Sequence, residues 1–439
     1  MLDVPLKKSK KYRCLVFALL GKCRLFNVNE KILVGIDGNG FKDWGGGIDF
    51  IATITEALEA TGKVHTYLLL DEMSTVNKIF KSIKIFIKSG LNLCLTIENF
   101  KKYKYENREI IDGFRTCTPN TKVVCYKTII NRFYNNLQKK QEQCLDENNI
   151  SIILPSIQCK KRNGSIARIG YIYDFQHKYY PDFFSKEVCE QRDRDFGEQL
   201  SDNDYVIVNA NEVKKDIFKF YPNNRCKVIV LPFKPFQKVE VPANIDLKKY
   251  DLPNKYYVIC NQFWLHKSHI TAFEALDALY ESGTTDIHIV CTGKMEDARS
   301  ENYIATLKKK VSRMKCRENI HFLGYIPKND QIGIMRNSIG LIQPTLFEGG
   351  PGGGATYNAL GLGLPCLLSD IPVNREVVGY DNVFFFEKEN SKMLAELMLA
   401  HQNDSHVEEK DINMKLSKNK KEYGEFLLDV INSVINTGK

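Results

Sequence analysis

A run of glycines near residue 350 is the part of this sequence with the clearest capacity for chemistry. Glu348 is followed by the segment 349–354, which reads GGPGGG, and then by a stretch that ends at Pro365. Glycines at five of six positions let the backbone approach a ligand closely and turn its N–H groups inward. A helix beginning near Thr356 would add unpaired N–H groups and a positive dipole end. The segment predicts a cradle for an anion or for hydroxyl groups, with the Glu348 carboxylate as an acceptor at its edge.

A second candidate is a lysine that, like the glycine run, lies shortly after an apolar run. The segment Asn261–His269 comes directly after the run Tyr256–Cys260 and before a helical stretch over Ala272–Leu279. A lysine just before a helix N-terminus could meet a diphosphate, because its charge would stabilise negative charge on a departing nucleotide. Lys267 is therefore a candidate phosphate ligand, and the alternative is an ordinary solvated lysine.

Two further segments could contribute to the same site. Asp174–Pro181 follows the apolar run Arg168–Tyr173, and His177 within it could carry a proton or orient a hydrogen bond. A histidine in this position can also be purely structural. Gly45–Gly47 precedes a helical run over Ile48–Leu58, so it forms a glycine turn at a helix N-terminus, suited to a phosphate or to the acceptor.

The elements that must position these residues are short apolar runs that alternate with helical stretches. Continuous apolar runs are typical of strands buried on both faces, as in a parallel sheet covered by helices. Alternating strands and helices indicate βαβ units. The expected strands are Lys31–Ile36, His65–Asp71, Asn92–Ile97, Ser151–Leu154, Arg168–Tyr173, Tyr205–Val208, Lys227–Leu231, Tyr256–Cys260, Asp286–Cys291, Ile320–Leu323, Ile339–Gln343, Pro365–Ser369 and Asn382–Phe386.

A proline-spaced polar stretch divides the 439 residues into two α/β halves. The expected organisation is a basic tail over 1–29, a first domain over 30–235, a linker over 236–252, a second domain over 253–405 and a helical segment over 406–439. We expect that last segment to pack back on the first domain. Ligands bind outside the carboxyl ends of strands in open α/β sheets. Two such sheets facing each other would form a cleft between the domains.

Composition restricts the class of protein. The 13 cysteines are scattered without a CxxC pair, which argues against a zinc ribbon and favours a reducing compartment. The sequence contains neither GxxxxGK[ST] nor a GxGxxG followed by a suitably placed acidic residue, which disfavours a P-loop protein and a dehydrogenase. The net charge of +9 is mild for this length, and we expect no nucleic-acid partner.

Contact with a membrane is expected to be peripheral at most. No apolar run approaches the roughly 20 residues that a membrane span requires. A helical pattern over Val76–Lys88 is apolar on one face and lysine-rich around it, which suits either the membrane interface or packing on its own sheet. The expected location is the cytoplasm, and the alternative is a cytoplasmic protein that contacts the inner face of the membrane.

These segments resemble family 4 retaining glycosyltransferases of the GT-B fold, of the kind that build bacterial O-antigens and capsules. The likeness is strong over Asn261–His269 and Glu348–Glu376, fair around Asp174–Pro181 and Gly45–Gly47, and general in layout from residue 30 to about 400. It implies an α/β protein with two Rossmann-like parallel-sheet domains that face each other across a cleft.

The resemblance also assigns roles to residues. Glu348 would face the donor sugar, Lys267 would bind phosphate and His177 would lie near the reactive end of the sugar. The implied donor-binding residues are Asn261, Lys267, Gly350, Gly352, Gly353, Gly354, Thr356 and Asn358. Gly46 and Gly47 match the first glycine loop of the family, and Asp174, Asn374 and Arg375 would support the site.

Two departures from the family pattern stand out. Counting back from Pro365 places Asn358 where a second glutamate normally holds the ribose, in a loop two residues longer. The arginine usually found shortly before the phosphate-binding lysine is replaced by Asn261 or Gln262, so Lys227 or Arg375 would have to compensate.

The predicted function is transfer of a hexose, mannose-like or related, from a GDP- or UDP-sugar to a glycan or lipid-linked acceptor in polysaccharide synthesis. The resemblance implies retention of configuration, with no metal and no cofactor besides the nucleotide sugar. Two alternatives remain open: a non-catalytic nucleotide-sugar-binding protein and a GT-B nucleotide-sugar epimerase.

Overall fold

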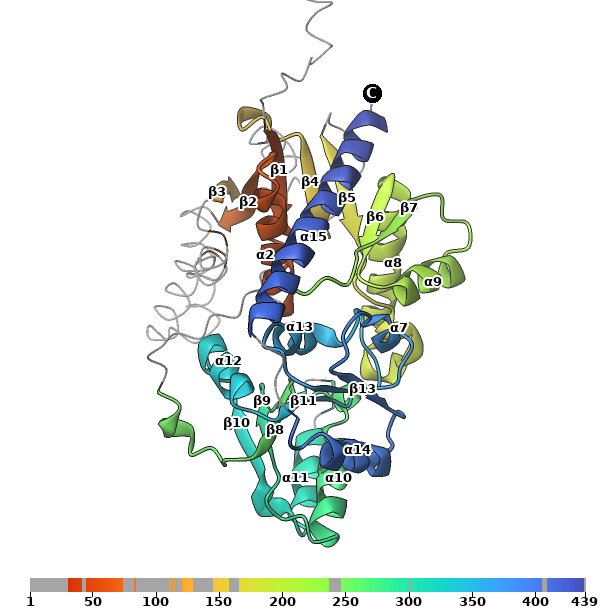
Figure 1. Cartoon of the computed structure of the whole chain (residues 1–439). Coiled ribbons are helices and arrows are strands. Elements are labelled where there is room, and N and C mark those ends of the chain that lie inside the picture. The colour runs from red at the N-terminus through yellow and green to blue at the C-terminus, as the bar shows by residue number, and fades with distance from the viewer. Residues whose placement is uncertain are drawn as a thin grey trace, which may run out of the picture.

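Two parallel β-sheets, one in each half of the sequence, organise the chain (Figure 1). The computed structural model describes residues 31–41, 45–73, 83, 111, 114, 118, 121–128, 145–157, 166–236, 246–297, 299–300, 302–404 and 409–437. The first sheet has seven strands in the order β3-β2-β1-β4-β5-β6-β7, and all its pairings are parallel. Its strands are β1 (Ile32–Asp37), β2 (Val64–Met73), β3 (Lys122–Thr128), β4 (Ile152–Ser156), β5 (Ala167–Tyr171), β6 (Tyr205–Val208) and β7 (Lys227–Val230).

The second sheet has six strands in the order β10-β9-β8-β11-β12-β13, again all parallel. Its strand order reverses at β8, and β11 pairs there with Tyr257 and Val258. Such a reversal opens a crevice at the carboxyl ends of the strands. The strands are β8 (Tyr256–Cys260), β9 (His288–Thr292), β10 (Ile320–Gly324), β11 (Gly340–Gln343), β12 (Cys366–Ser369) and β13 (Val383–Phe386).

Helices connect the strands, as parallel pairing requires. Those described in full in the first domain are α2 (Gly45–Ala60), α7 (Gln176–Tyr179), α8 (Lys186–Asp202) and α9 (Asn211–Phe220). In the second domain they are α10 (His269–Glu281), α11 (Tyr303–Val311), α12 (Lys328–Arg336), α13 (Gly353–Gly361) and α14 (Ser391–Ala400). Short 3-10 turns are η1 (Pro181–Phe183), η2 (Lys248–Tyr250), η3 (Leu265–Lys267), η4 (Arg317–Asn319) and η5 (Asn374–Glu376).

The final helix, α15 (Glu409–Thr437), returns from the second domain to the first and runs beside α2 (Figure 1). Its buried face includes Tyr423, Leu427 and Ile431, which belong to the apolar core formed by α2 and the first sheet. The two helices approach closely at Gly424, where a Cβ atom would lie 2.3 Å from the Ala57 carbonyl oxygen. The first domain therefore takes part of its core from the end of the chain.

Two polar contacts join α9 and α2 of the first domain to the second domain. The Glu376 carboxylate accepts hydrogen bonds from the backbone N–H groups of Asn211 and Glu212, at 2.8 and 3.0 Å. A carboxylate at the N-terminus of α9 is favourable because it meets unpaired N–H groups and the positive end of the helix dipole. Lys328 on α12 forms a 3.0 Å ion pair with Asp49 on α2.

The predicted architecture of two parallel-sheet α/β domains is confirmed. Twelve of the thirteen expected strands coincide with strands of the structure, while Asn92–Ile97 lies outside the described residues. The edge strand β3 was not predicted, because its apolar run is only four residues long and lysines flank it. Charged residues are common on edge strands, which pair on one side only.

Several expectations fall outside the described part of the chain. They are the basic tail over 1–29, the amphipathic helix over Val76–Lys88 apart from Ile83, and residues 237–245 of the linker. Among the helices that are described, none has the length and apolar character needed to cross a bilayer.

Candidate active site

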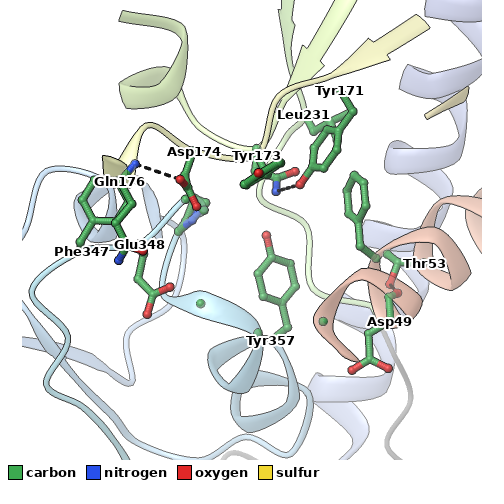
Figure 2. Close-up of a pocket in the computed structure, with 18 of the residues that line it drawn as sticks. Asp49, Thr53, Tyr171, Tyr173, Asp174, Gln176, Leu231, Phe347, Glu348 and Tyr357 are labelled. Carbon is green, nitrogen blue, oxygen red and sulfur yellow. Dashed lines mark hydrogen bonds between the residues drawn. The ribbon is translucent and has the colours of Figure 1, made fainter. Parts of the chain in front are cut away.

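A cavity of about 650 Å³ lies between the two domains and is lined by residues of both (Figure 2). The first domain contributes residues from α2, from the loop after β5 and from the segment that follows β7. The second contributes residues from the loop after β8, the glycine-rich loop after β11 and the first turns of α13. The cavity thus lies at the carboxyl ends of both sheets, as expected for ligand sites in open α/β folds.

A lysine and a glutamate form an ion pair on the second-domain side of this cavity. Lys267 Nζ lies 2.5 Å from Glu348 Oε1, and both side chains are about one-tenth exposed. Gln343 Nε2 donates to the same Glu348 oxygen at 3.2 Å, and Asn261 Nδ2 donates to Gln343 Oε1 at 2.6 Å. The structure therefore brings Lys267, predicted to bind the donor, together with Glu348, predicted to face the donor sugar. Asn261, the other predicted donor ligand here, supports them through Gln343 and does not itself line the cavity.

The glycine-rich loop carries Glu348 and passes directly into α13. Gly352 and Gly353 have φ angles of +67° and +66°, a region that favours glycine. A Cβ atom on Gly353 would also lie 2.6 Å from Gln343 Nε2 and 3.1 Å from Glu348 Oε1. Gly353 is therefore required for the helix to begin immediately beside the carboxylate.

Two other glycines of the loop serve the contact between the domains. A Cβ atom on Gly349 would lie 2.4 Å from the Tyr173 carbonyl oxygen, and one on Gly350 would lie 3.2 Å from Asn209 Cβ. Both partners belong to the first domain. Gly349 is therefore a point of contact between the two domains. Gly349, Gly350, Gly353 and Gly354 all line the cavity.

Asn374 supports the loop from behind. Its Oδ1 accepts a 3.0 Å hydrogen bond from the Gly352 N–H, and its Nδ2 donates to the Ser369 carbonyl oxygen at 2.8 Å. The side chain is fully buried, and neither Asn374 nor Gly352 lines the cavity. The role that the structure gives Asn374 is to hold the loop in place.

The two candidates on α13 lie in different environments. Thr356 is fully buried, and its hydroxyl donates to the Gly352 carbonyl oxygen at 2.5 Å, so it does not reach the cavity. Asn358 lines the cavity, and its amide has no hydrogen bond to another described side chain. Asn358 therefore remains a candidate ligand for donor hydroxyls.

His177 does not line the cavity, although Asp174 and Gln176 beside it do. The imidazole is buried between α7 and α8, where its Nε2 lies 2.9 Å from Asp193 Oδ1 and its ring contacts Phe196. Burial lowers the pKa of His177 despite the Asp193 carboxylate. The short helix α7 turns Gln176 toward the cleft and His177 away from it, so the structure does not place this histidine at the reacting sugar.

Of the remaining predicted residues, one lines the cavity and the others do not. Gly46 lines the cavity, whereas Gly47 is buried outside it. Arg375 is paired with Asp370 at 2.5 Å and does not line the cavity. Lys227 lies over the ring of Tyr205 at the start of β7, the opposite end of the strand. Neither cation replaces the missing arginine.

The structure reveals a cation at this site that the sequence motifs did not identify. Arg299 lines the cavity and follows β9, with its guanidinium 4.6 Å from the centre of the Trp264 ring. Asp297 holds its Nε at 3.0 Å, and its NH1 donates to Gln176 Oε1 of the first domain at 3.3 Å. Arg299 follows the carboxyl end of a parallel strand, and this topological rule could have identified it.

Two histidines beside Lys267 are kept neutral. Burial, assisted by Lys267 and Arg299, lowers the pKa of His266 to about 2, and burial lowers that of His269 to about 3. The His269 ring is fully buried, stacks on Phe263 at 4.1 Å and has no hydrogen-bond partner on either nitrogen. A neutral imidazole adds no charge beside the Lys267–Glu348 pair.

This burial predicts a pH dependence of stability that a single substitution should reduce. The unfolded chain protonates His269 below about pH 6.5, while the folded chain keeps it neutral down to about pH 3. The free energy of unfolding should therefore fall by up to about 1.4 kcal/mol per pH unit between those values. We expect His269→Phe to remove this contribution, as measured by urea unfolding at pH 7, 6, 5 and 4. If the free energy of unfolding depended on pH in the same way in the wild type and in the His269→Phe variant, this prediction would be wrong.

A comparison with protein families gives a match over the second domain. Residues 245–423 match the family model described as glycosyl transferases group 1, a segment that contains Lys267, Arg299 and the glycine-rich loop. No curated protein is significantly similar in sequence to this chain.

Solved structures resemble the chain over nearly its whole length. A glycosyltransferase from Rickettsia africae is 14% identical, with a TM-score of 0.56, over 93% of this chain and 99% of that one. HepE from Anabaena in complex with UDP is 13% identical, with a TM-score of 0.57, over 92% and 100%. Sucrose-phosphate synthase from Thermosynechococcus elongatus is 12% identical, with a TM-score of 0.53, over 90% and 95%. The expected GT-B fold is thereby confirmed.

Proposed function

We propose that this chain, whose residues 245–423 match the glycosyl transferases group 1 model, transfers a hexose from a nucleoside diphosphate sugar to a hydroxyl group. The observation that carries the proposal is the Lys267–Glu348 ion pair, which faces a glycine-rich loop inside the cavity between the domains. Cations and loop N–H groups suit the diphosphate, and a carboxylate suits the hydroxyls of the sugar. HepE, a protein of the same fold, is described in complexes with UDP and with UDP-glucose, which supports a nucleotide sugar as the ligand.

The proposed reaction proceeds with retention of configuration. The bond between the anomeric carbon and the diphosphate breaks, the acceptor oxygen bonds to that carbon on the same face, and the acceptor proton passes to the departing phosphate. Lys267 and Arg299 would stabilise the charge that develops on the diphosphate, and Glu348 would hold the sugar. Asn358 would hydrogen-bond the ribose. We assign no catalytic step to His177 and propose that the transfer needs no metal.

The biological setting that we propose is polysaccharide synthesis, with a GDP- or UDP-hexose of mannose-like or related configuration as donor. The direct test is to incubate the protein with UDP- and GDP-hexoses, with and without EDTA, and to measure free nucleotide. Release that persists in EDTA would support the proposal. Binding of a nucleotide without release from any donor would favour a non-catalytic binding protein, and conversion of the sugar without release would favour an epimerase.

A single glycine tests the role of the loop separately from the fold. A Cβ atom on Gly354 would meet no described atom within 4 Å other than its chain neighbours and the backbone of its own helix. Gly354 lies in the first turn of α13 and lines the cavity. Gly354→Ala should leave the Tm unchanged or slightly higher, because alanine is the better helix former by about 0.5–1 kcal/mol. We expect it to weaken nucleotide binding by about tenfold, since the added methyl group would occupy space that the proposed ligand needs. Unchanged affinity for UDP and GDP, measured by calorimetry, would exclude this loop as the donor cradle.

A further inference from the structure

Aromatic side chains line the cavity on the side of α2 and α15. These are Phe50, Tyr171, Tyr357 and Tyr423, which we call the aromatic half of the cavity. Phe50 stacks on Tyr171 with ring centres 4.6 Å apart, and Asn209 Nδ2 donates to the Tyr171 hydroxyl at 2.6 Å. Figure 2 shows Tyr357 rising from α13 toward Tyr171, with Asp49 and Thr53 of α2 to one side. Ring packing and the Asn209–Tyr171 hydrogen bond therefore hold the aromatic half in place.

Hydrogen-bonding groups border the aromatic half. The Tyr357 hydroxyl lines the cavity and has no hydrogen bond to any other described residue. The Asp49 carboxylate pairs with Lys328 through one oxygen, at 3.0 Å. An apolar surface with polar groups at its margin matches a pyranose ring, which has an apolar C–H face and hydroxyl groups around its edge.

The charges that line the two ends of the cavity differ. At the end formed by the loops after β5, β8, β9 and β11, the described lining residues include three cations, Lys267, Arg299 and Arg192, and two carboxylates, Glu348 and Asp174. At the aromatic end they include one cation, Lys234, and one carboxylate, Asp49. Lys234 is also paired with Glu422. The three cations of the first end are paired as well, with Glu348, Asp297 and Asp174 respectively. Among the described lining residues the two ends therefore differ in the number of cations that could contact an anionic ligand, three against one, and, once the ion-pair partners are counted, not in net charge.

From these observations we infer that the aromatic half is an acceptor subsite for an uncharged pyranose, the terminal sugar of a neutral glycan. The inference rests on the proposed function, which places the nucleotide at the other end of the cavity. Glu348 belongs to the first end, and Figure 2 shows its carboxylate on the side of that end toward Tyr357. An acceptor sugar on the aromatic half would therefore present a hydroxyl to the sugar held by Glu348. Phe50 and Tyr357 would determine specificity for the acceptor without contacting the nucleotide.

The test measures binding of acceptor analogues to the full chain saturated with UDP or GDP. The probes are the methyl pyranosides of glucose, mannose and galactose, and the matching hexose 6-phosphates, titrated by saturation-transfer NMR. We expect at least one neutral pyranoside to bind more tightly than its phosphate. Tyr357→Ala and Phe50→Ala should each weaken that binding by about tenfold, and the Kd of the nucleotide should stay within twofold of the wild type. Tyr357→Phe, which removes only the hydroxyl, should have an intermediate effect.

Tyr325→Ala is the matched control, because Tyr325 is 78% exposed and lies outside the cavity. Tighter binding of the hexose phosphates, no binding of any neutral pyranoside, or unchanged affinity in both the Tyr357→Ala and Phe50→Ala variants would overturn the inference. The nucleotide titration is read separately. Absence of UDP and GDP binding would instead refute the proposed function, so the two failures are distinguishable.

Discussion

Glu348→Gln should lower kcat/KM for sugar transfer by about 10²–10³-fold, the loss typical when one preorganised electrostatic contact to a transition state is removed. Glutamine keeps the size of the side chain but removes the charge that binds Lys267 Nζ at 2.5 Å and accepts from Gln343. The sugar would lose a charged hydrogen-bond acceptor. The diphosphate would lose nothing, because Lys267 keeps its own charge.

This difference makes the prediction specific to the sugar. We expect the Kd of free UDP or GDP to be unchanged or lower in the Glu348→Gln variant, while kcat falls. Calorimetry and initial-rate measurements on the same preparation would check both. Glu296→Gln is the control, because it makes the same substitution at a side chain that is 73% exposed. A parallel loss of nucleotide affinity would mean that the pair serves only to support the fold, and full activity would refute our assignment of Glu348.

Gly349→Ala should lower activity by about 10²-fold without unfolding either domain. The backbone of Gly349 has a φ that other residues adopt, so the effect is purely steric: the new Cβ atom would lie 2.4 Å from the Tyr173 carbonyl oxygen. Relief of this overlap requires a displacement of about 1 Å between the loop and the first domain, and misplacement on that scale can cost about 10²-fold in rate. Nucleotide affinity should fall less than kcat/KM, because the cations of the second domain are unaffected.

Small-angle scattering with and without nucleotide would show whether the Gly349→Ala variant has the same radius of gyration as the wild type. Gly197→Ala in α8 makes the same change where the nearest atom would be Tyr221 Cε1 at 3.7 Å, and it should retain activity. If Gly349→Ala were as active as wild type, the contact between Gly349 and Tyr173 could not be part of the active arrangement.

The positions of the strand ends could be predicted from the sequence, and so could the functional candidates that follow those strands. Lys267 and Glu348 come after β8 and β11, two neighbouring strands of one sheet, so the topology alone brings them to the same edge. The role of each glycine was not predictable. Gly353 leaves room for the Glu348 side chain, and Gly349 leaves room for the Tyr173 carbonyl group. These close approaches depend on which atoms the tertiary fold places beside each glycine.

Side-chain direction explains the other differences. His177 and Gln176 are neighbours in a four-residue helix, where a rotation of about 100° decides which one faces the cleft. Sequence spacing does not determine that rotation in so short an element. The aromatic half of the cavity combines residues of α2, β5, α13 and α15, segments more than 350 residues apart at the extremes, and no local motif connects them.

The return of α15 to the first domain has a consequence for the order of folding during synthesis. The second domain has apolar clusters formed by residues between 233 and 398, all of which leave the ribosome before α15 is complete. The core of the first domain requires Tyr423, Leu427, Ile431 and Val434, which are translated after all the residues of those clusters. The first domain therefore cannot complete its core until α15 has been translated, and α2 exposes the surface that α15 covers until then.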